Sequence, residues 1–498
     1  MYKSLLTFPL WVALLGAPVA SATDAANTEG LFKEHCAGCH GTTRTGAMGP
    51  ALLPENLSRL RKKEAIEVIG HGRAATQMPA FSEKLTTAQI ASLADLIYTA
   101  PPVSPAWTID DIRTSQVIYH PEGSLPDKPK YQADLQNLFI VVELGDHSAT
   151  LLNGDTFEPI HRFKTRFALH GGPKYSPDGR YVYFASRDGW ISKYDIYNME
   201  FVAEVRAAIN TRNLAVSYDG KYAIVGNYLP HNLVILDTRD LSPVKVINVE
   251  DEAGTSSRVS AVYTAPPRQS FIAALKDLKE VWEIPYDNNP EFKVRRIKVD
   301  DYLDDFFFDP SYKHLIGASR DSDDGQVVDM DAGKKTHTVD LAGMPHLGSG
   351  ITWEYQGKPI LATPNLKEGQ ISFIDMTTWK VIKRIETKGP GFFMRSHENT
   401  PYAWVDVFFG PNKDLMHIID KRTLEIVKTL QPAPGKTAAH VEFTQDGKYA
   451  LMSIWDMDGA VVVYDANTFE EIKRIPMKKP SGKYNVFNKT TYSRGTSH

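Results

Sequence analysis

The sequence has few cysteines, little excess charge and no long apolar run beyond its first residues. Its 498 residues include only 2 cysteines, which excludes a framework of several disulfides. The formal net charge of -4 is small for this length and argues against a protein that binds nucleic acid. No later segment is apolar enough to cross a bilayer, so we expect no membrane span.

The first 22 residues have the pattern of a secretory signal peptide. Lys3 is the sole charge before Asp24, residues 5–15 are apolar, and Ala20-Ser21-Ala22 is a small-residue cleavage site. A membrane anchor is the alternative, but the apolar run is short and contains Pro9. We therefore expect cleavage after Ala22 and a periplasmic protein.

Both cysteines lie in the pentapeptide Cys36-Ala37-Gly38-Cys39-His40. A C-x-x-C pair alone is also compatible with thiol redox chemistry. The histidine that follows, together with the export signal, favours covalent attachment of a haem c through Cys36 and Cys39. His40 would supply one axial nitrogen to the iron. The sequence therefore predicts a c-type cytochrome, a protein that transfers electrons.

Residues 23–105 have the length of a small all-α cytochrome c domain. A helix is expected over residues 26–35. A second helix is expected after the capping box Thr86-Thr87-Ala88-Gln89 and should end before Pro101-Pro102. Met78, in Gln77-Met78-Pro79, is predicted as the second axial ligand because its thioether suits a haem iron. His71 and His35 are the alternatives.

The remaining chain has the pattern of short strands and turns that is typical of a β-protein. The chain has many prolines from Pro101 to about Lys130, and residues 106–134 are predicted as a linker, or as an arm laid on the next domain. In residues 135–498 a unit of several short strands recurs about every 40 to 49 residues, as comparison of 176–185, 217–226 and 444–453 illustrates. First strands near residues 138, 181, 222, 271, 314, 360, 402 and 449 predict an all-β, eight-bladed propeller, with seven or nine blades as alternatives.

Five segments of this β-region carry a resemblance to a known family. They are Ala168-Leu169-His170, Arg187-Asp188-Gly189, Thr211-Arg212-Asn213, Met344-Pro345-His346 and Ser481-Gly482-Lys483-Tyr484-Asn485-Val486. In this order they resemble segments of the cytochrome cd1 nitrite reductase family, in which a cytochrome c domain precedes an eight-bladed propeller that binds haem d1.

The resemblance implies roles for four residues. His170 would ligate the iron of haem d1, and His346 would be one of two distal histidines; which of them ligates the iron stays open. Arg187 and Arg212 would pair with carboxylates of the macrocycle, because guanidinium groups bind carboxylates through two hydrogen bonds. Arg162, Arg166 and Arg395 are further candidates for this pairing.

The departures from the reductases are informative. Asp304 stands where their second distal histidine would be, and Ser349 stands where they have an arginine. Two histidines supply protons during nitrite reduction, so a chain with one of them should reduce nitrite poorly. This pattern resembles the dihydro-haem d1 dehydrogenases, paralogues of the reductases that act in haem d1 synthesis.

The resemblance implies the oxidation of a propionate side chain of dihydro-haem d1 to an acrylate, with electrons leaving through haem c. The tetrapyrrole would then be substrate and product. Such a reaction needs a base, for which we predict His440, assisted by Tyr484. A hydrogen-bonded strand histidine and a packed core tyrosine are the alternatives for these two residues.

Three other functions are alternatives to this dehydrogenation. The chain could be a carrier that inserts haem d1 into a cytochrome cd1 nitrite reductase, a weak nitrite reductase, or a plain electron-transfer protein. A pure carrier would have no use for haem c, and Asp304 argues against nitrite reduction. Expected partners are the tetrapyrrole, a cytochrome cd1 nitrite reductase and a small electron acceptor.

Overall fold

The computed structural model describes residues 22–73, 78–286, 291–319, 321–341 and 343–491, with side chains described from residue 27. Of the predicted signal peptide, only Ala22 falls within these ranges. Residues 1–100 and residues 101–498 belong to two separate compact units. In the described ranges, no helix has both the length and the apolarity that a membrane crossing requires.

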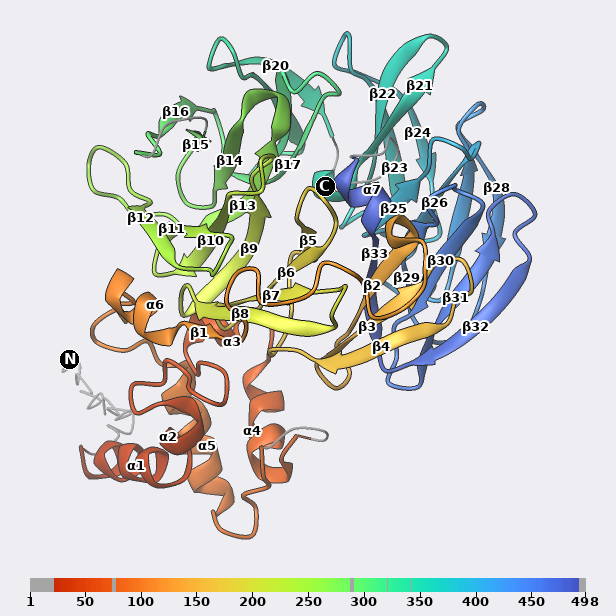
Figure 1. The fold of residues 1–498 in the computed structure, drawn as a ribbon. Helices are drawn as coiled ribbons and strands as arrows, with labels where there is room; N and C mark the ends of the chain where they lie inside the picture. The colour runs from red at the N-terminus through yellow and green to blue at the C-terminus, as the bar shows by residue number, and fades with distance from the viewer. Residues whose placement is uncertain (1–21, 74–77, 287–290, 320, 342, 492–498) are drawn as a thin grey trace, which may run out of the picture. The chain divides into compact units, whose positions relative to one another are not determined.

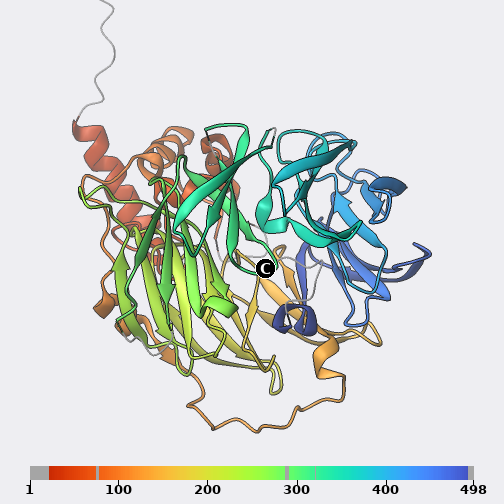
Figure 2. The ribbon, with the colours of Figure 1, turned by 90° about the horizontal axis from the view of Figure 1, so that it is seen from above.

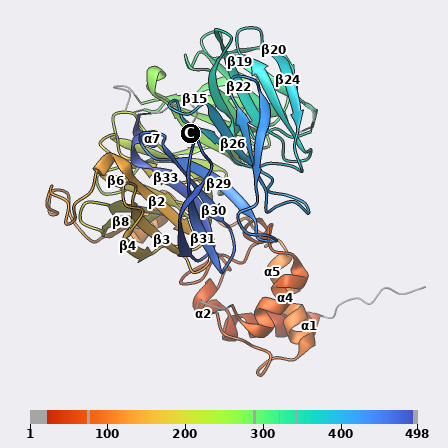
Figure 3. The ribbon, with the colours of Figure 1, turned by 90° about the vertical axis from the view of Figure 1, so that its right-hand side faces the viewer.

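The first unit is helical. Its helices are α1 (Ala22–His35), α2 (Ala37–His40), α3 (Pro54–Leu57), α4 (Lys62–His71) and α5 (Thr87–Tyr98). The predicted capping box is present at the start of α5, where Thr86 and Gln89 exchange side-chain-to-backbone hydrogen bonds. Helix α5 packs against α1 and α4 (Figure 3) and buries Ile90, Leu93, Ala94 and Ile97 at helical spacing.

The second unit is a β-propeller, which confirms the predicted fold. Among the described residues its strands form eight antiparallel sheets that follow one another around a ring, from yellow to blue in Figure 1. Within each blade, neighbouring strands in the order of the sheet are hydrogen-bonded to each other. The first four blades are β33 (Pro480–Asn485), β2 (Leu138–Glu143), β3 (Ser148–Asn153), β4 (Pro159–Lys164); β5 (Lys174–Tyr175), β6 (Tyr181–Ala185), β7 (Trp190–Asp195), β8 (Glu200–Arg206); β9 (Asn210–Val216), β10 (Tyr222–Leu229), β11 (Asn232–Asp237), β12 (Pro243–Asn248); and β13 (Val259–Ala265), β14 (Ser270–Leu275), β15 (Glu280–Pro285), β16 (Arg295–Lys298).

The other four blades repeat the same order. They are β17 (Leu303–Phe308), β18 (His314–Ser319), β19 (Asp324–Asp329), β20 (Lys334–Asp340); β21 (Ile351–Tyr355), β22 (Lys358–Pro364), β23 (Gln370–Asp375), β24 (Lys380–Glu386); β25 (Met394–Ser396), β26 (Tyr402–Asp406), β27 (Met416–Asp420), β28 (Glu425–Leu430); and β29 (Ala438–Phe443), β30 (Tyr449–Ile454), β31 (Gly459–Asp465), β32 (Glu471–Met477). First strands of successive blades contact one another, for example β9 with β13 and β25 with β29. They are therefore the inner strands of the ring.

The unit that repeats in the sequence does not begin at the same strand as the blade in the structure. The predicted first strands near residues 138, 181 and 222 are β2, β6 and β10, each of which is the second strand of its sheet. In seven blades the inner strand precedes the repeated unit in the chain, and in the first blade the inner strand is β33 from the C-terminal segment. This difference has a physical reason, because the inner strands carry side chains of the candidate functional site.

The ring is closed by the last strand of the chain. Strand β33 pairs antiparallel with β2, with Lys483 opposite Val141, and also contacts β29 (Figure 3). Helix α7 (Val486–Thr490) follows β33 directly. The C-terminal segment therefore completes the first blade and brings Tyr484 to the inner strands.

The segment before the first blade lies along the propeller (Figure 2). It contains α6 (Ile109–Ser115) and β1 (Val117–Ile118), and β1 pairs with the outer strand β8. Ile112 is fully buried among residues of the neighbouring blades, and Trp107 Nε1 donates a hydrogen bond to the carbonyl of Arg206 at 2.9 Å. Burying a side chain of this size stabilises a fold by roughly 1.5–3 kcal/mol.

Candidate functional site

Cys36, Cys39 and His40 form a site suited to covalent haem. Both cysteines are half-buried free thiols at α2, and burial raises the pKa of Cys36 to about 11. His40 Nδ1 donates a hydrogen bond to the carbonyl of Pro50 at 2.7 Å, so Nε2 is the nitrogen left to coordinate iron. Burial also lowers the pKa of His40, which keeps its imidazole neutral as ligation requires. The donor set fits a haem c.

The three candidates for the second axial ligand, Met78, His71 and His35, differ in their surroundings. It packs against the core of the helical unit, which Cys36 also joins, and its carbonyl accepts a hydrogen bond from the Arg73 amide. The His71 side chain is 74% exposed, and its Nδ1 lies 3.3 Å from Oε2 of Glu67. His35 packs its ring beside Phe81 at 6.0 Å.

His170 and Arg212 contact each other in the propeller. His170 precedes β5, and its Nδ1 donates to the carbonyl of Arg212 at 2.6 Å. Its Nε2 therefore carries the lone pair, and Arg212 Nη1 donates to that atom at 2.9 Å. The backbone of Arg187 is hydrogen-bonded to neighbours of both residues. Its amide donates to the carbonyl of Ala168, and its carbonyl accepts from the amide of Thr211.

His346 is anchored in a comparable way. Its Nδ1 donates to the carbonyl of Phe392 at 2.6 Å, and the two rings lie 4.2 Å apart. Its Nε2 lies 3.7 Å from Oδ2 of Asp305. Burial lowers the pKa of His346, although Asp305 opposes this effect. The acid beside His346 is thus Asp305, whereas Asp304 pairs with Lys276 at 2.8 Å.

His440 is the most unusual side chain of the site. It is 1% exposed, and neither ring nitrogen has a hydrogen-bond partner in the described part of the chain. Its backbone has a φ of 48° at a bulge of β29, a left-handed conformation that is costly for a residue with a side chain. Burial and the charge of Lys483 lower its pKa well below 6.5, so the imidazole is neutral. A buried, neutral and unbonded imidazole is suited to accept a proton.

Tyr484 lies beside His440, with ring centroids 5.3 Å apart. Burial raises its pKa to about 12, so the hydroxyl stays protonated and can donate a hydrogen bond. The ring fits only because two neighbours lack a side chain. A Cβ atom at Gly172 would lie 2.8 Å from Tyr484 Cε1, and one at Gly482 would lie 2.5 Å from its hydroxyl oxygen.

A group of cations interacts electrostatically with these residues. Arg395, on β25, is 4% exposed and interacts with Tyr484, His346 and His440. Lys174 and Lys489 are half-buried, and burial together with Arg395 lowers their pKa values to about 8 and about 7. The buried carboxylate of Glu442 interacts with Arg395, Lys489 and Tyr484, so it shares this place with the cations. The cations outnumber it, and an excess of positive charge favours a ligand with carboxylates.

Two candidate arginines lie elsewhere. Arg162 binds Glu143 and Asp146, and Arg166 binds Glu204 and stacks on the ring of Trp190 at 3.8 Å. Both are therefore engaged in ion pairs of their own blades. Of the three further arginines considered from the sequence, Arg395 is the one that the structure brings to the site.

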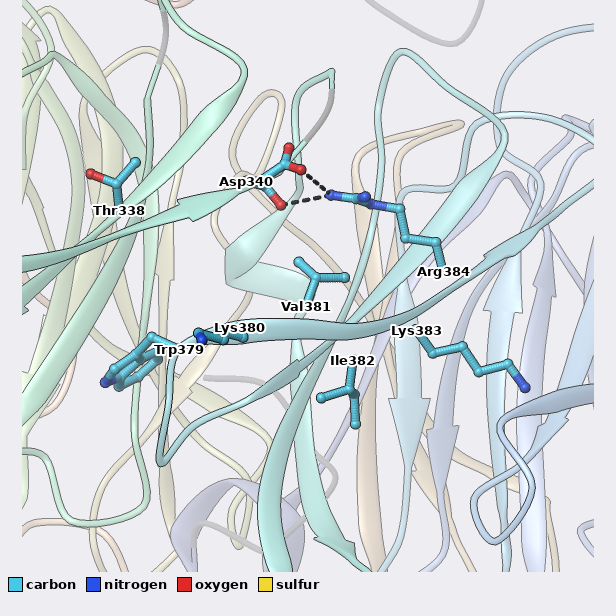
Figure 4. Close-up of a pocket in the computed structure, with 8 residues that line it drawn as sticks. All are labelled: Thr338, Asp340, Trp379, Lys380, Val381, Ile382, Lys383 and Arg384. Carbon is cyan, nitrogen blue, oxygen red and sulfur yellow. Dashed lines mark hydrogen bonds and ion pairs between the residues drawn. The ribbon is translucent and has the colours of Figure 1, made fainter.

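A hollow of about 510 Å³ lies on the outer strands β20 and β24 (Figure 4). It is lined by Thr338, Asp340, Trp379, Lys380, Val381, Ile382, Lys383 and Arg384. Asp340 and Arg384 form an ion pair across it at 3.2 Å. None of the functional candidates lines this hollow.

Comparison with known proteins gives the same assignment as the fold. The family model described as "Cytochrome D1 heme domain" matches residues 133–489. The chain belongs to the cytochrome D1 heme domain family. Residues 23–97 match a second model, described as "Cytochrome C oxidase, cbb3-type, subunit III", so a cytochrome c domain precedes the D1 heme domain.

Individual relatives are similar over nearly the whole chain. The dihydro-heme d1 dehydrogenase of Pseudomonas aeruginosa is 58% identical, with 97% of this chain and 98% of that protein covered. The nitrite reductase of Stutzerimonas stutzeri is 26% identical, with 96% and 95% covered. The solved structure "Dihydro-heme d1 dehydrogenase NirN in complex with DHE" matches with a TM-score of 0.92 and 58% identity, covering 93% of this chain and 99% of that one.

Three residues that the structure brings to the site were not predicted from the sequence. Lys174, Lys489 and Asp406 occur in no motif, and their significance depends on burial beside His440, Tyr484 and Arg395. A usable sequence signal did exist for Lys489, since it lies five residues after Tyr484 in the terminal segment. Lys174 likewise follows His170 by four residues.

Proposed function

We propose that this protein is a periplasmic c-type cytochrome oxidoreductase of haem d1 synthesis. It oxidises a propionate side chain of dihydro-haem d1 to an acrylate and passes the electrons to its haem c. The observation that carries this proposal is the buried, neutral and unbonded imidazole of His440 beside Tyr484. The similarity to a dihydro-heme d1 dehydrogenase over 97% of the chain supports the same reaction.

The reaction converts –CH2–CH2–COO⁻ into –CH=CH–COO⁻ and releases two protons and two electrons. His440 accepts a proton from the side chain, since its pKa keeps it unprotonated at neutral pH. Tyr484 donates a hydrogen bond that orients the carboxylate, because its own pKa of about 12 keeps the hydroxyl protonated. A haem c held by Cys36, Cys39, His40 and Met78 would accept one electron at a time. The two electrons would therefore leave in two successive transfers, with haem c reoxidised by the small electron acceptor between them.

The macrocycle is held by histidines and arginines. In both His170 and His346, Nδ1 is bonded to a backbone carbonyl, so Nε2 is the nitrogen through which either ring would ligate an iron. Arg187 and Arg212 bind carboxylates of the macrocycle, and Arg395 adds positive charge near the reacting side chain. The chemistry of imidazole and guanidinium groups and the resemblance to the reductase family support these roles.

The location and the partners follow from the reaction. A signal peptide over residues 1–22 would direct the chain to the periplasm, where haem c is attached. The product would be used by a cytochrome cd1 nitrite reductase, and a small electron acceptor would reoxidise the haem c. The tetrapyrrole is the substrate.

One experiment separates this function from the alternatives. Purified protein with oxidised haem c is mixed with dihydro-haem d1 without oxygen, and the haem c absorbance and the mass of the extracted tetrapyrrole are followed. We expect reduction of haem c and a mass loss of two hydrogens. Tight binding with unchanged mass would instead indicate a haem d1 carrier, and turnover of nitrite with an electron donor would indicate a nitrite reductase.

A further inference from the structure

Asp406 is a buried carboxylate that accepts hydrogen bonds from three backbone amides. It is the last residue of β26 and is 0% exposed. Its Oδ1 accepts from the amides of Phe392 at 2.7 Å and Phe393 at 3.0 Å. Its Oδ2 accepts from the amide of His440 at 3.2 Å. One carboxylate therefore joins the segment before β25 to the inner strand β29 of the next blade.

The two hydrogen bonds to Oδ1 of Asp406 help to fix the position of His346. Phe392 supplies the carbonyl that accepts the Nδ1 proton of His346, and its ring packs at a tilt against the same imidazole, with centroids 4.2 Å apart. Because the Phe392 amide is held by Asp406, the position of that carbonyl depends on the carboxylate. The orientation of His346 Nε2 is thereby linked to Asp406 through one intervening residue.

The hydrogen bond to Oδ2 of Asp406 helps to fix the backbone of His440. The left-handed backbone of His440 sits at the bulge of β29, and its amide has Asp406 as acceptor while its carbonyl accepts from Lys483 Nζ at 2.5 Å. Phe393, also bonded to Asp406, packs its ring on that of His440 at 4.8 Å. The strained conformation is therefore held from both sides of the residue.

We propose that Asp406 is the positioning residue that sets His346 and His440 in fixed relation to each other. This inference rests on the proposed function, in which His346 faces the iron and His440 takes the proton. A carboxylate suits the task because its two oxygens accept from separate donors at once. Dehydrogenation requires the reacting carbon to be near the base while the macrocycle is bound, so a small shift between the two histidines lowers kcat.

The test uses Asp406→Asn and Asp406→Ala in the full-length protein with its haem c attached. An asparagine can keep both Oδ1 bonds to Phe392 and Phe393, but it turns an N–H donor toward the His440 amide. We expect Asp406→Asn to lower kcat for haem c reduction about tenfold or more, with KM changed less than about threefold. The absorbance of the bound tetrapyrrole should be unchanged. Asp406→Ala loses all three bonds and should also change that absorbance and raise KM.

Asp414→Asn is the matched control. Asp414 is a buried carboxylate at the same pair of blades that accepts from the Gly435 amide at 2.7 Å, and no described hydrogen bond ties it to His346 or His440. Its kcat should equal that of the wild type. Thermal unfolding of each variant checks that it is folded.

His440→Ala, measured in parallel, separates the two proposals. If His440→Ala is inactive and Asp406→Asn turns over at the wild-type rate, the positioning role is wrong and the proposed function stands. If His440→Ala is active, His440 is not the base. In that case a slow Asp406→Asn variant would also contradict the positioning role, because Asp406 could not act on the rate by positioning His440. Slow turnover in both variants, with Asp414→Asn unaffected, supports both proposals.

Discussion

Arg212 Nη1 donates a hydrogen bond to His170 Nε2 over 2.9 Å, while His170 Nδ1 donates to the carbonyl of Arg212. The guanidinium therefore caps the lone pair through which His170 would ligate an iron. Ligation requires Arg212 to move away, and a carboxylate of the macrocycle is a suitable new partner for it. In the proposed function, substrate binding and iron ligation would thus be coupled at Arg212.

Replacing Arg212 tests this coupling, because its two roles predict opposite changes in the affinity for the tetrapyrrole. A hydrogen bond to a charged group contributes about 1.5–3 kcal/mol, so Arg212→Leu should weaken tetrapyrrole binding about 10- to 100-fold. Titration followed by absorbance measures the affinity. Arg239→Leu, which removes an exposed arginine paired with Asp237, should bind normally. Tighter binding by Arg212→Leu would mean that Arg212 only caps His170.

Met78 determines the electronic properties of the haem c if it ligates the iron. Thioether ligation raises the potential relative to imidazole, so Met78→His should lower the haem c potential and abolish the sulfur-to-iron charge-transfer band. Redox titration and absorbance spectroscopy check both. His71→Ala should leave both unchanged, since its side chain is 74% exposed. A band that survives in Met78→His rules out Met78 as ligand.

Removing the imidazole of His440 should stop the chemistry and spare binding. General-base catalysis contributes about 10²- to 10⁴-fold, and His440→Ala should lose a rate factor of this size. The absorbance change on adding dihydro-haem d1 should remain. His314→Ala is the control, because His314 lies on β18 and pairs with Asp309 at 3.3 Å. Wild-type turnover by His440→Ala would discard its role as base.

The rate of dehydrogenation should fall as the pH drops through about 6. Burial raises the pKa of Asp406 to about 6, against its three amide donors and the positive charge of Arg395. Lys483 also interacts with Asp406 electrostatically. Below this pH the carboxyl gains a proton and loses capacity as an acceptor for the amides that hold His440.

The imidazole of His440 does not produce this acidic limb, because its pKa lies well below 6.5. A profile of kcat between about pH 5 and 8 measures the limb. It should be absent from Asp406→Asn, whose side chain does not titrate. Persistence of the same limb in that variant would assign it to another group.

Gly172 allows Tyr484 to occupy its place. Gly172→Ala combines a φ of 71° with a Cβ atom 2.8 Å from the tyrosine ring, and should cost about 1–3 kcal/mol of folding stability while slowing turnover. Gly254→Ala is the control, because its φ is 84° but no atom lies within 4 Å of the added Cβ. Thermal unfolding and haem c reduction measure the two effects. Equal turnover in both variants would show that Tyr484 needs no such space.

Contiguous features of the sequence sufficed to predict the haem c attachment and the fold class. Cys36, Cys39 and His40 lie within five residues, so their joint role does not depend on how the rest of the chain folds. The blades were recognisable because β2, β6 and β10 belong to a repeated unit of similar strands and turns. His170, Arg212 and His346 were predicted through resemblance to a family, and His440 and Tyr484 were predicted as the base and the assisting residue that the implied reaction needs.

The tertiary structure alone brought the site residues together and separated true neighbours from apparent ones. Arg162 and Arg395 look equivalent in sequence, yet one pairs with Glu143 and the other is buried beside Tyr484. Strand β17 has a register shift between Leu303 and Asp305, and at this irregularity Asp305, and not Asp304, lies beside His346. Asp406 lies 34 residues from His440 and is joined to it by a single hydrogen bond between neighbouring blades. Such a relation depends on how the ring closes, and no local pattern in the sequence encodes it.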